Sequence, residues 1–341
     1  MRERWLVGAG GAVLLALPLL NLLPAGAPFA VSDFTLNLFG KFLAYAILAL
    51  GIDLLWGYAG VLSLGHGVFF GLGAYAMGMH LMLEIGTRGV YQNALPDFMV
   101  WNQVTELPLF WRPFYSPLFT LAAILLVPAL VALAFGHLIF RSRIRGVYFS
   151  IITQALALSA WLVFNRNAMN LGGTNGLSGF KTLLGFPLDS PGTQRGLYVA
   201  TALCLVGAYL LCRFIVRSPA GRVLVAIRDS ETRVLFSGYS PAAYKRFVFA
   251  VSALLAGVAG ALYVPQVGII TPTKMGVLPS IEMIIWVAVG GRGTLVGAVL
   301  GAVCVNWLQS RLTTSYPDYW LLVLGALFIG VVLLFPDGLV G

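Results

Sequence analysis

The chain has 341 residues, of which 59% are hydrophobic and only 10% are charged, and its mean hydropathy is +0.91. This composition excludes a soluble globular protein and indicates an all-α, polytopic membrane protein. The net charge of +9 does not indicate nucleic-acid binding, because the Lys and Arg residues lie in loops between apolar segments, as membrane topology requires.

Apolar segments of span length recur along the chain. They predict about ten membrane spans, at residues 5–23, 34–55, 58–83, 117–140, 143–164, 196–216, 246–265, 278–290, 292–310 and 319–336. With the N-terminus inside, thirteen of the 21 Lys and Arg residues fall on the cytoplasmic side, seven fall outside, and Lys41 lies within the second span. This bias predicts cytoplasmic N- and C-termini and two long outer loops, at residues 84–116 and 165–195.

Residues 217–245 form the only long polar and basic interval between these segments, and they predict a cytoplasmic loop. Ser218-Pro219 is typical of a helix start, and Gly238 suits the helix C-cap. One face of this helix, spanning roughly 120°, is apolar and the opposite face is polar. The loop either lies on anionic lipid or docks in a groove on a cytoplasmic partner. The apolar face carries Val223, Leu224, Ile227, Val234 and Leu235. The opposite face carries Arg222, Ala226, Asp229 and Arg233.

Two apolar segments are interrupted by glycines, at residues 57–75 and 287–302. Under the predicted topology, the blocks 34–164 and 246–336 run in opposite directions across the bilayer. Glycine-broken spans in two inverted halves are typical of a translocation path. Glycines at this spacing are equally typical of close helix packing, and both interpretations can hold.

Polar side chains within apolar spans are candidates for functional positions, because burying them in a bilayer is costly. A histidine beside glycines can instead be a packing donor, and a glutamate at a span end can simply be hydrated. In a secondary transporter, residues such as Glu282, Asp53 or His66 would form the ion site. The candidates for lining a path are Ser63, His66, Glu282 and Trp286.

Motifs of several enzyme classes are absent from the sequence. It has no GxxxxGK[ST] P-loop, and its three cysteines show neither metal nor disulfide spacing. Residues 176–179 read GLSG and match the GxSG of intramembrane serine proteases. Those enzymes pair the serine with a histidine on a later span, whereas all three histidines here lie upstream. We therefore expect no catalytic residue, metal or cofactor in this chain.

Five segments of the sequence carry a family resemblance. SPAGRVLVAIRDSETRVLFSG (218–238) resembles the coupling loop of ABC importer permeases of the branched-chain amino acid type. The other matches are GYAGVLSLGHGVFFGLGAY (57–75), AVSALLAGVAGALY (250–263), GGRGTLVGAVLGA (290–302) and FPDGLVG (335–341). Within that family, FWRPFYSP (110–117) and NLGGTNGLSGFKTLLGF (170–186) resemble the urea-transporting branch.

The resemblance implies a single permease domain, residues 1–341, in the bacterial inner membrane. It implies a second related permease, two cytoplasmic ATPase subunits that hold ATP and Mg, and a periplasmic binding protein that delivers the substrate. Val223, Leu224 and Ile227 would enter a groove on the ATPase, with charged residues at its rim. The residues implied in coupling are Arg222, Val223, Leu224, Ala226, Ile227, Arg228, Asp229 and Gly238.

The resemblance makes urea the expected substrate. Urea is small and neutral and has hydrogen-bond donors and acceptors, so its path needs amide-matching groups more than a fixed charge. Branched-chain amino acids are the main alternative, and a zwitterion would favour charged partners in the path. A passive urea channel and a secondary transporter are further alternatives. The candidate path residues for urea are Ser63, His66, Asn170, Thr174 and Asn175.

Overall fold

The computed structural model describes residues 10–11, 14–24, 29–142 and 146–316, together with 318–319, 322–323, 325–326, 329–330, 333 and 338–340. Within these residues the fold is almost entirely helical, as the composition predicts. The helices are α2 (Asp33–Asp53), α3 (His66–Ile85), α4 (Asp97–Trp101), α5 (Pro117–Arg141), α6 (Val147–Phe164), α7 (Pro191–Arg217), α8 (Pro219–Phe236), α9 (Pro241–Val267), α10 (Val277–Gly290) and α11 (Leu295–Ser315).

Short elements fill the connections. A π-helical turn, η1 (Leu54–Tyr58), continues α2. Strand β1 (Leu177–Ser178) pairs antiparallel with β4 (Ile269–Ile270), and β2 (Thr182–Leu183) pairs antiparallel with β3 (Phe186–Pro187). The 3-10 turns are η2 (Gly86–Arg88), η3 (Arg112–Tyr115), η4 (Asn167–Met169), η5 (Gly173–Asn175) and η6 (Pro272–Met275).

Seven described helices are long and apolar enough to cross a membrane, judged by length and composition. The chain is thus a multi-pass membrane protein. The predicted span 278–290 corresponds to α10, whose 14 residues make it too short to cross a bilayer. The third predicted span begins too early, because residues 59–65 are not helical and α3 begins at His66. The predicted spans 5–23 and 319–336 lie largely outside the described residues.

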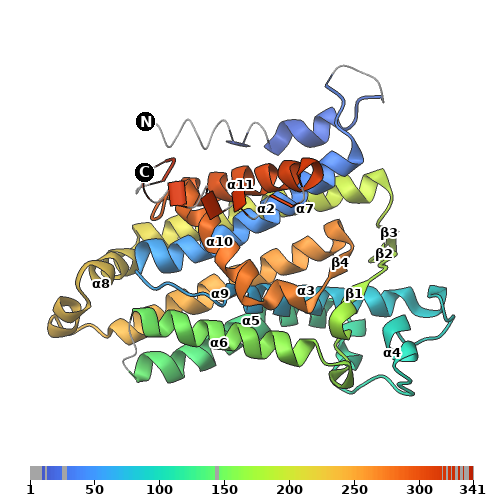
Figure 1. The fold of residues 1–341 in the computed structure, drawn as a ribbon, viewed down its shortest axis with the longest axis horizontal. Coiled ribbons are helices and arrows are strands. Elements are labelled where there is room, and N and C mark those ends of the chain that lie inside the picture. Colours follow the sequence, from blue (N-terminus) through green and yellow to red (C-terminus); the bar gives the residue numbers. More distant parts are fainter. Residues whose placement is uncertain are drawn as a thin grey trace.

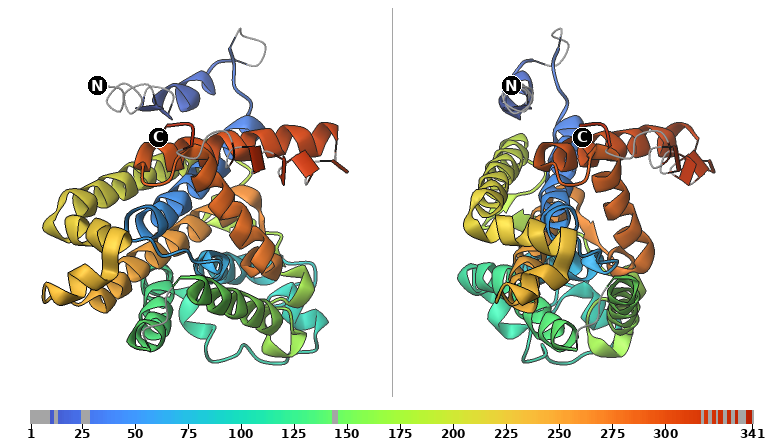
Figure 2. Two further views of the ribbon diagram at one scale, coloured as in Figure 1. Left: turned by 60° about the vertical axis from the view of Figure 1, so that its left-hand side comes forward. Right: turned by 90° about the vertical axis from the view of Figure 1, so that its left-hand side faces the viewer.

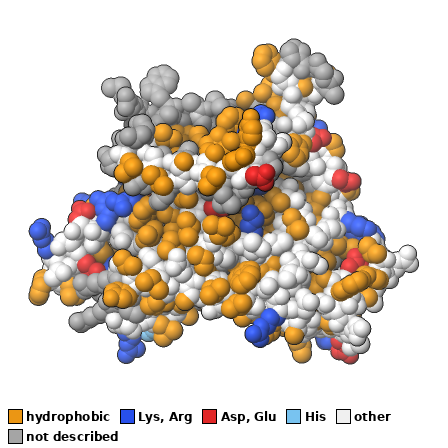
Figure 3. All heavy atoms as spheres, viewed as in Figure 1, with side chains coloured by type: hydrophobic (Ala, Val, Ile, Leu, Met, Phe, Trp, Pro, Cys, Tyr) orange, Lys and Arg blue, Asp and Glu red, His pale blue; other side chains and the backbone are white. Residues whose placement is uncertain are grey.

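The bundle has distinct ends and sides. α8 lies at one end, and α4 with β1, β2 and β3 lies at the other (Figure 1). α2 runs through the middle, between α7 on one side and α10 with α11 on the other (Figure 2). Most charged side chains lie toward the ends, whereas hydrophobic side chains dominate the middle (Figure 3). α5, α6 and α7 expose most of their apolar surface, as expected of helices that face lipid.

Glycines allow the central helices to touch through their backbones. A Cβ atom added at Gly260 of α9 would overlap the carbonyl oxygen of Phe70 in α3, and one at Gly73 would overlap that of Gly257. Gly301 is packed in the same way against Trp286 and the neighbouring turn of α10. Close backbone packing is therefore observed at Gly73 and Gly301, which lie in the two glycine-interrupted segments, and at Gly260 of α9. The inverted relationship of residues 34–164 and 246–336 stays a prediction.

We predict that Gly260→Ala forces α3 and α9 apart and destabilises the fold by about 1–3 kcal/mol. The measurement is the thermal unfolding midpoint of the detergent-solubilised protein. Gly207→Ala in α7 is the matched control, because an added Cβ there has nothing within 4 Å. Equal midpoints for the two variants would contradict the packing argument.

Candidate functional site

The basic loop of residues 217–245 folds as the sequence predicts at both of its ends. Ser218 caps α8, and its Oγ accepts a hydrogen bond from the Gly221 amide at 3.3 Å. Gly238, with φ +84°, follows the end of the helix, and Pro241 begins α9. The helix is kinked at Ser230, where φ is −161° and ψ is 91°. The kink turns the last part of α8 away from the direction of its first part.

The apolar face of α8 packs against this chain itself. Leu224 and Ile227 are buried, at 0% and 3% exposure, and Val234 is buried as well. α8 contacts α7, α9 and η1. The side chains of Leu224 and Ile227 are therefore not free to enter a groove on a partner, contrary to the expectation. The amphipathic pattern placed Leu224, Ile227 and Val234 on the buried face correctly, whereas Leu235, predicted on the same face, is 45% exposed.

The exposed surface of α8 consists of a hollow and a protruding tip. The hollow has a volume of about 530 Å³ and is lined in part by Arg222, Val223, Ala226 and Asp229. The tip carries apolar side chains that are exposed to water, and Phe236 is 86% exposed. Exposed apolar groups of this size mark interaction surfaces. We call this surface the α8 tip; it consists of Leu235, Phe236 and Tyr239.

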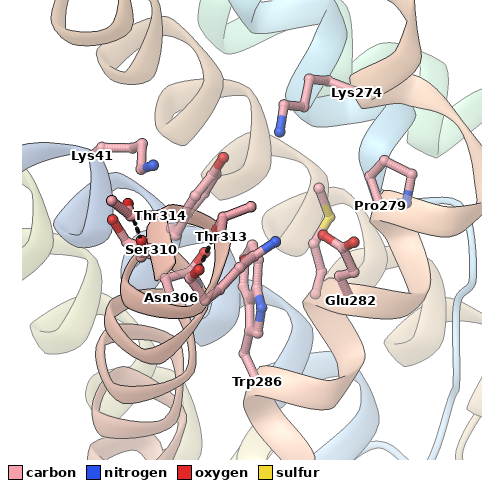
Figure 4. Close-up of a pocket in the computed structure, with 12 residues that line it drawn as sticks. Lys41, Lys274, Pro279, Glu282, Trp286, Asn306, Ser310, Thr313 and Thr314 are labelled. Atoms are coloured by element: carbon pink, nitrogen blue, oxygen red, sulfur yellow. Dashed lines mark hydrogen bonds between the residues drawn. The ribbon is translucent and has the colours of Figure 1, made fainter. Parts of the chain in front are cut away.

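A polar cavity of about 340 Å³ lies between the helices (Figure 4). Lys41 of α2, Lys274 of η6 and Glu282 of α10 point toward it from three different elements (Figure 4). The rings of Tyr45 and Trp286 pack against each other at a tilt of 40°, with centroids 4.7 Å apart. The remaining lining residues are Pro279, Met283, Asn306, Gln309, Ser310, Thr313 and Thr314.

The charged groups of this cavity are not paired with one another. Among the described residues, no ion pair within 4.0 Å joins Glu282 to Lys41 or Lys274. The indole Nε1 of Trp286 is buried and has no hydrogen-bond partner within the described part of the chain. A buried donor without a partner is costly. The cavity thus offers a polar ligand one buried donor without a partner in the described part of the chain, beside the charged side chains of Lys41, Lys274 and Glu282.

The other candidate path residues lie elsewhere. His66 is fully buried and its Nε2 lies 2.7 Å from Ser252 Oγ, while Ser63 is buried at the non-helical entry to α3. The carbonyl oxygen of Asn170 accepts a hydrogen bond from Trp111 Nε1 at 2.9 Å and so ties the loops 84–116 and 165–195 together. Thr174 and Asn175 are exposed in η5. None of these five residues lines the polar cavity, and their place in a path stays a prediction.

Sequence reasoning selected Glu282 and Trp286 but missed most of the cavity. Lys41 carried a usable signal, because a lysine inside an apolar span is expensive and therefore informative. Lys274 carried none, since it lies in a short connection that resembles any loop. Asn306 and the hydroxyl groups of α11 gave only a mildly polar helix. The described residues contain no group of three His, Cys, Asp or Glu side chains that could hold a metal.

A multi-pass bundle with a charged cavity between its helices is typical of a membrane transport protein. A family model described as "Branched-chain amino acid transport system / permease component" matches residues 34–332, and the chain belongs to this family. It is therefore the permease component of an ABC importer and is not itself catalytic.

Curated relatives cover most of the chain. It is 26% identical to the high-affinity branched-chain amino acid transport system permease protein LivM of Escherichia coli, over 95% of this chain and 74% of that protein. It is 26% identical to BraD of Pseudomonas aeruginosa, a high-affinity branched-chain amino acid transport system permease protein, over 87% of this chain and 91% of that protein. It is 24% identical to the ribose import permease protein RbsC of Haemophilus influenzae, over 74% of this chain and 75% of that protein. No solved structure matches the chain. Relatives named for different substrates leave the substrate undetermined.

Proposed function

We propose that this chain is one of two related permease subunits of an ATP-driven importer for urea in a bacterial inner membrane. ATPase subunits would bind at α8, and a periplasmic protein would deliver the substrate at the opposite end, beside α4 and β1. The observation that carries the substrate assignment is the composition of the polar cavity. The excess of Lys and Arg on the α8 side supports cytoplasmic termini.

A second permease would cover the open side of the polar cavity. The cavity side of α11 presents hydroxyl and amide groups, of which Thr313 and Thr314 are exposed. Lys41 lies eight residues into α2, about 12 Å along its axis. Charged and polar groups at such depth do not face lipid. A related permease that presents polar groups of its own would shield them and complete the path between the two chains.

The cavity fits urea better than a branched aliphatic substrate. Apart from the rings of Tyr45 and Trp286, only Pro279 and Met283 contribute apolar lining. A leucine side chain would therefore lose water contact without gaining an apolar pocket. Urea presents paired N–H groups that suit the Glu282 carboxylate, and a carbonyl oxygen that suits a lysine ammonium.

One observation favours a second candidate. Lys41, Lys274 and Glu282 place charges of both signs around the cavity, and the two ends of a zwitterionic amino acid match such a pair of signs. An amino acid with a small or polar side chain satisfies the same lining. The choice between urea and an amino acid therefore depends on a functional comparison.

We predict that urea-loaded binding protein stimulates the ATPase activity of the reconstituted importer, and that leucine-loaded protein does not. ATP hydrolysis is measured in proteoliposomes that contain the permease pair and the ATPase subunits. Stimulation by leucine alone would overturn the substrate assignment but keep the importer. Urea flux through the same vesicles without ATP would instead indicate a passive channel. Loss of uptake on collapse of the proton gradient, with ATP present, would indicate a secondary transporter.

We predict that Glu282→Gln lowers urea uptake by about tenfold, because a carboxamide replaces one of the two acceptor oxygens with a donor and removes the charge. Radiolabelled urea uptake is measured in proteoliposomes, with assembly checked by co-purification. Asp189→Gln, in an outer loop away from the cavity, is the control. Unchanged uptake in Glu282→Gln would remove the cavity from the path.

The ATPase would engage the α8 tip and the adjoining hollow. Phe236 and Leu235 present exposed apolar groups, and Arg222 and Arg233 flank the hollow with positive charge. This chemistry fits an ATPase surface that has an apolar pocket and an acidic rim. The buried face of α8 would in this arrangement hold the helix on the permease.

We predict that Phe236→Asp releases the co-expressed ATPase subunits while the permease keeps its fold, because a charge replaces the most exposed apolar group of the tip. Co-purification and the thermal midpoint of the permease are the measurements. Thr232→Asp, which adds the same charge to the exposed side of α8, is the matched control. ATPase subunits that stay bound to Phe236→Asp would refute the role of the tip.

A further inference from the structure

Arg228 of α8 reaches into the bundle rather than toward a partner. Its Nη1 donates a hydrogen bond to the carbonyl oxygen of Gly57 in η1, at 2.8 Å. Its Nε donates to Asp229 Oδ1 at 3.0 Å. The side-chain stem lies against Gly60, whose φ is +69° and where an added Cβ would lie 2.9 Å from Arg228 Cγ. Position 60 therefore suits glycine both for its backbone conformation and for the room that Arg228 occupies.

The same turn of η1 touches the connection between α10 and α11. Asp53 Oδ1 accepts a hydrogen bond from the Gly293 amide at 2.6 Å. A Cβ added at Gly57 would lie 2.5 Å from that Gly293 nitrogen, so the two backbones are in direct contact. The guanidinium of Arg292 lies 5.3 Å from the ring centroid of Trp56. The end of α2 and the α10–α11 connection are thus held together by a hydrogen bond, a backbone contact and a cation–π contact.

Both elements that meet at this point also form walls of the polar cavity. α2 carries Lys41 and Tyr45, and α10 carries Glu282 and Trp286. We propose that Arg228 is the positioning residue that transmits movement of α8 to the cavity, by holding the Gly57 carbonyl where α2 meets the α10–α11 connection. The inference rests on the proposed function, because it needs an ATPase to move α8.

The hydrogen bonds of Arg228 suit the transmission of movement, because they fix the position of α8 along η1. The guanidinium is planar and donates from two edges, one to Gly57 and one to Asp229. α8 cannot slide past η1 without breaking a hydrogen bond that is charge-assisted and partly buried. By contrast, the apolar contacts of Leu224 and Ile227 keep α8 on the bundle but tolerate small sliding. The buried apolar side chains therefore hold α8 against the bundle, and the hydrogen bond of Arg228 fixes where along η1 the helix lies.

The test separates coupling from assembly. Arg228→Met keeps the length of the stem and removes the donors, whereas Arg228→Lys keeps one donor. Arg217→Met, at the exposed end of α7, removes an equal charge from the same side of the protein and is the matched control. Co-purified ATPase subunits, basal ATP hydrolysis, and urea taken up per ATP hydrolysed are measured in the reconstituted importer with urea-loaded binding protein.

We expect Arg228→Met to keep its ATPase subunits and basal hydrolysis while uptake per ATP falls by about tenfold. Arg228→Lys falls by less, and Arg217→Met matches the wild type. Loss of the ATPase subunits from Arg228→Met would assign the residue to docking and overturn the proposal, as would unchanged uptake per ATP. Should Arg228→Met fail to fold, wild-type coupling in Arg228→Lys would overturn it. A wild-type importer that no loaded binding protein stimulates would refute the proposed function itself.

Discussion

Inside a bilayer, backbone that leaves the helix must find its hydrogen bonds within the protein. The segment that leads into α3 meets this requirement with side chains from α6 and α10. Ser150 Oγ donates to the Leu62 carbonyl at 2.7 Å, and Thr153 Oγ1 accepts from the Leu64 amide at 3.0 Å. Ser280 Oγ accepts from the Gly67 amide at 3.1 Å. Each small polar side chain substitutes for a missing helical hydrogen bond.

The same constraint explains where the polar side chains of the spans are located. Most are committed to the fold: Ser252 bonds to Gly51 and His66, and Thr201 bonds to Gln266. Around the polar cavity, Asn306 also bonds to its own helix, at the Ala302 carbonyl, whereas the buried indole Nε1 of Trp286 has no hydrogen-bond partner among the described residues. Polar groups that do not serve the backbone, within a membrane bundle, are the groups left for a ligand or a second subunit.

The sequence predicted the helices well and their contacts poorly. Hydropathy located seven helices of span length among the described residues, and Ser218-Pro219 and Gly238 located the ends of α8, because these signals are local. The start of α3 at His66 was missed, since the apolar residues 59–65 look the same whether helical or extended. The sequence also could not predict the surface against which the apolar face of α8 packs, because amphipathicity defines a buried face but not the surface that covers it. Lys274 and Asn306 reach the cavity only through tertiary packing, which no spacing in the chain encodes.

The length of α2 would amplify a movement that Arg228 passes to the Gly57 end of this helix. Gly57 and Lys41 are sixteen residues apart, so they lie about 24 Å apart along the helix. A tilt of about 10° about the Gly57 end would therefore move the Lys41 end by about 4 Å, a displacement typical of transporter-scale switching rather than of thermal fluctuation. That displacement exceeds the reach of a hydrogen bond, so it would be enough to make or break the contact of Lys41 with a ligand as small as urea. Because α10 meets α2 at the same point, the carboxylate of Glu282 would move relative to Lys41, and the cavity would lose its donors and its acceptor together. A permease without an ATP site can in this way release a neutral polar ligand by separating the groups that bind it.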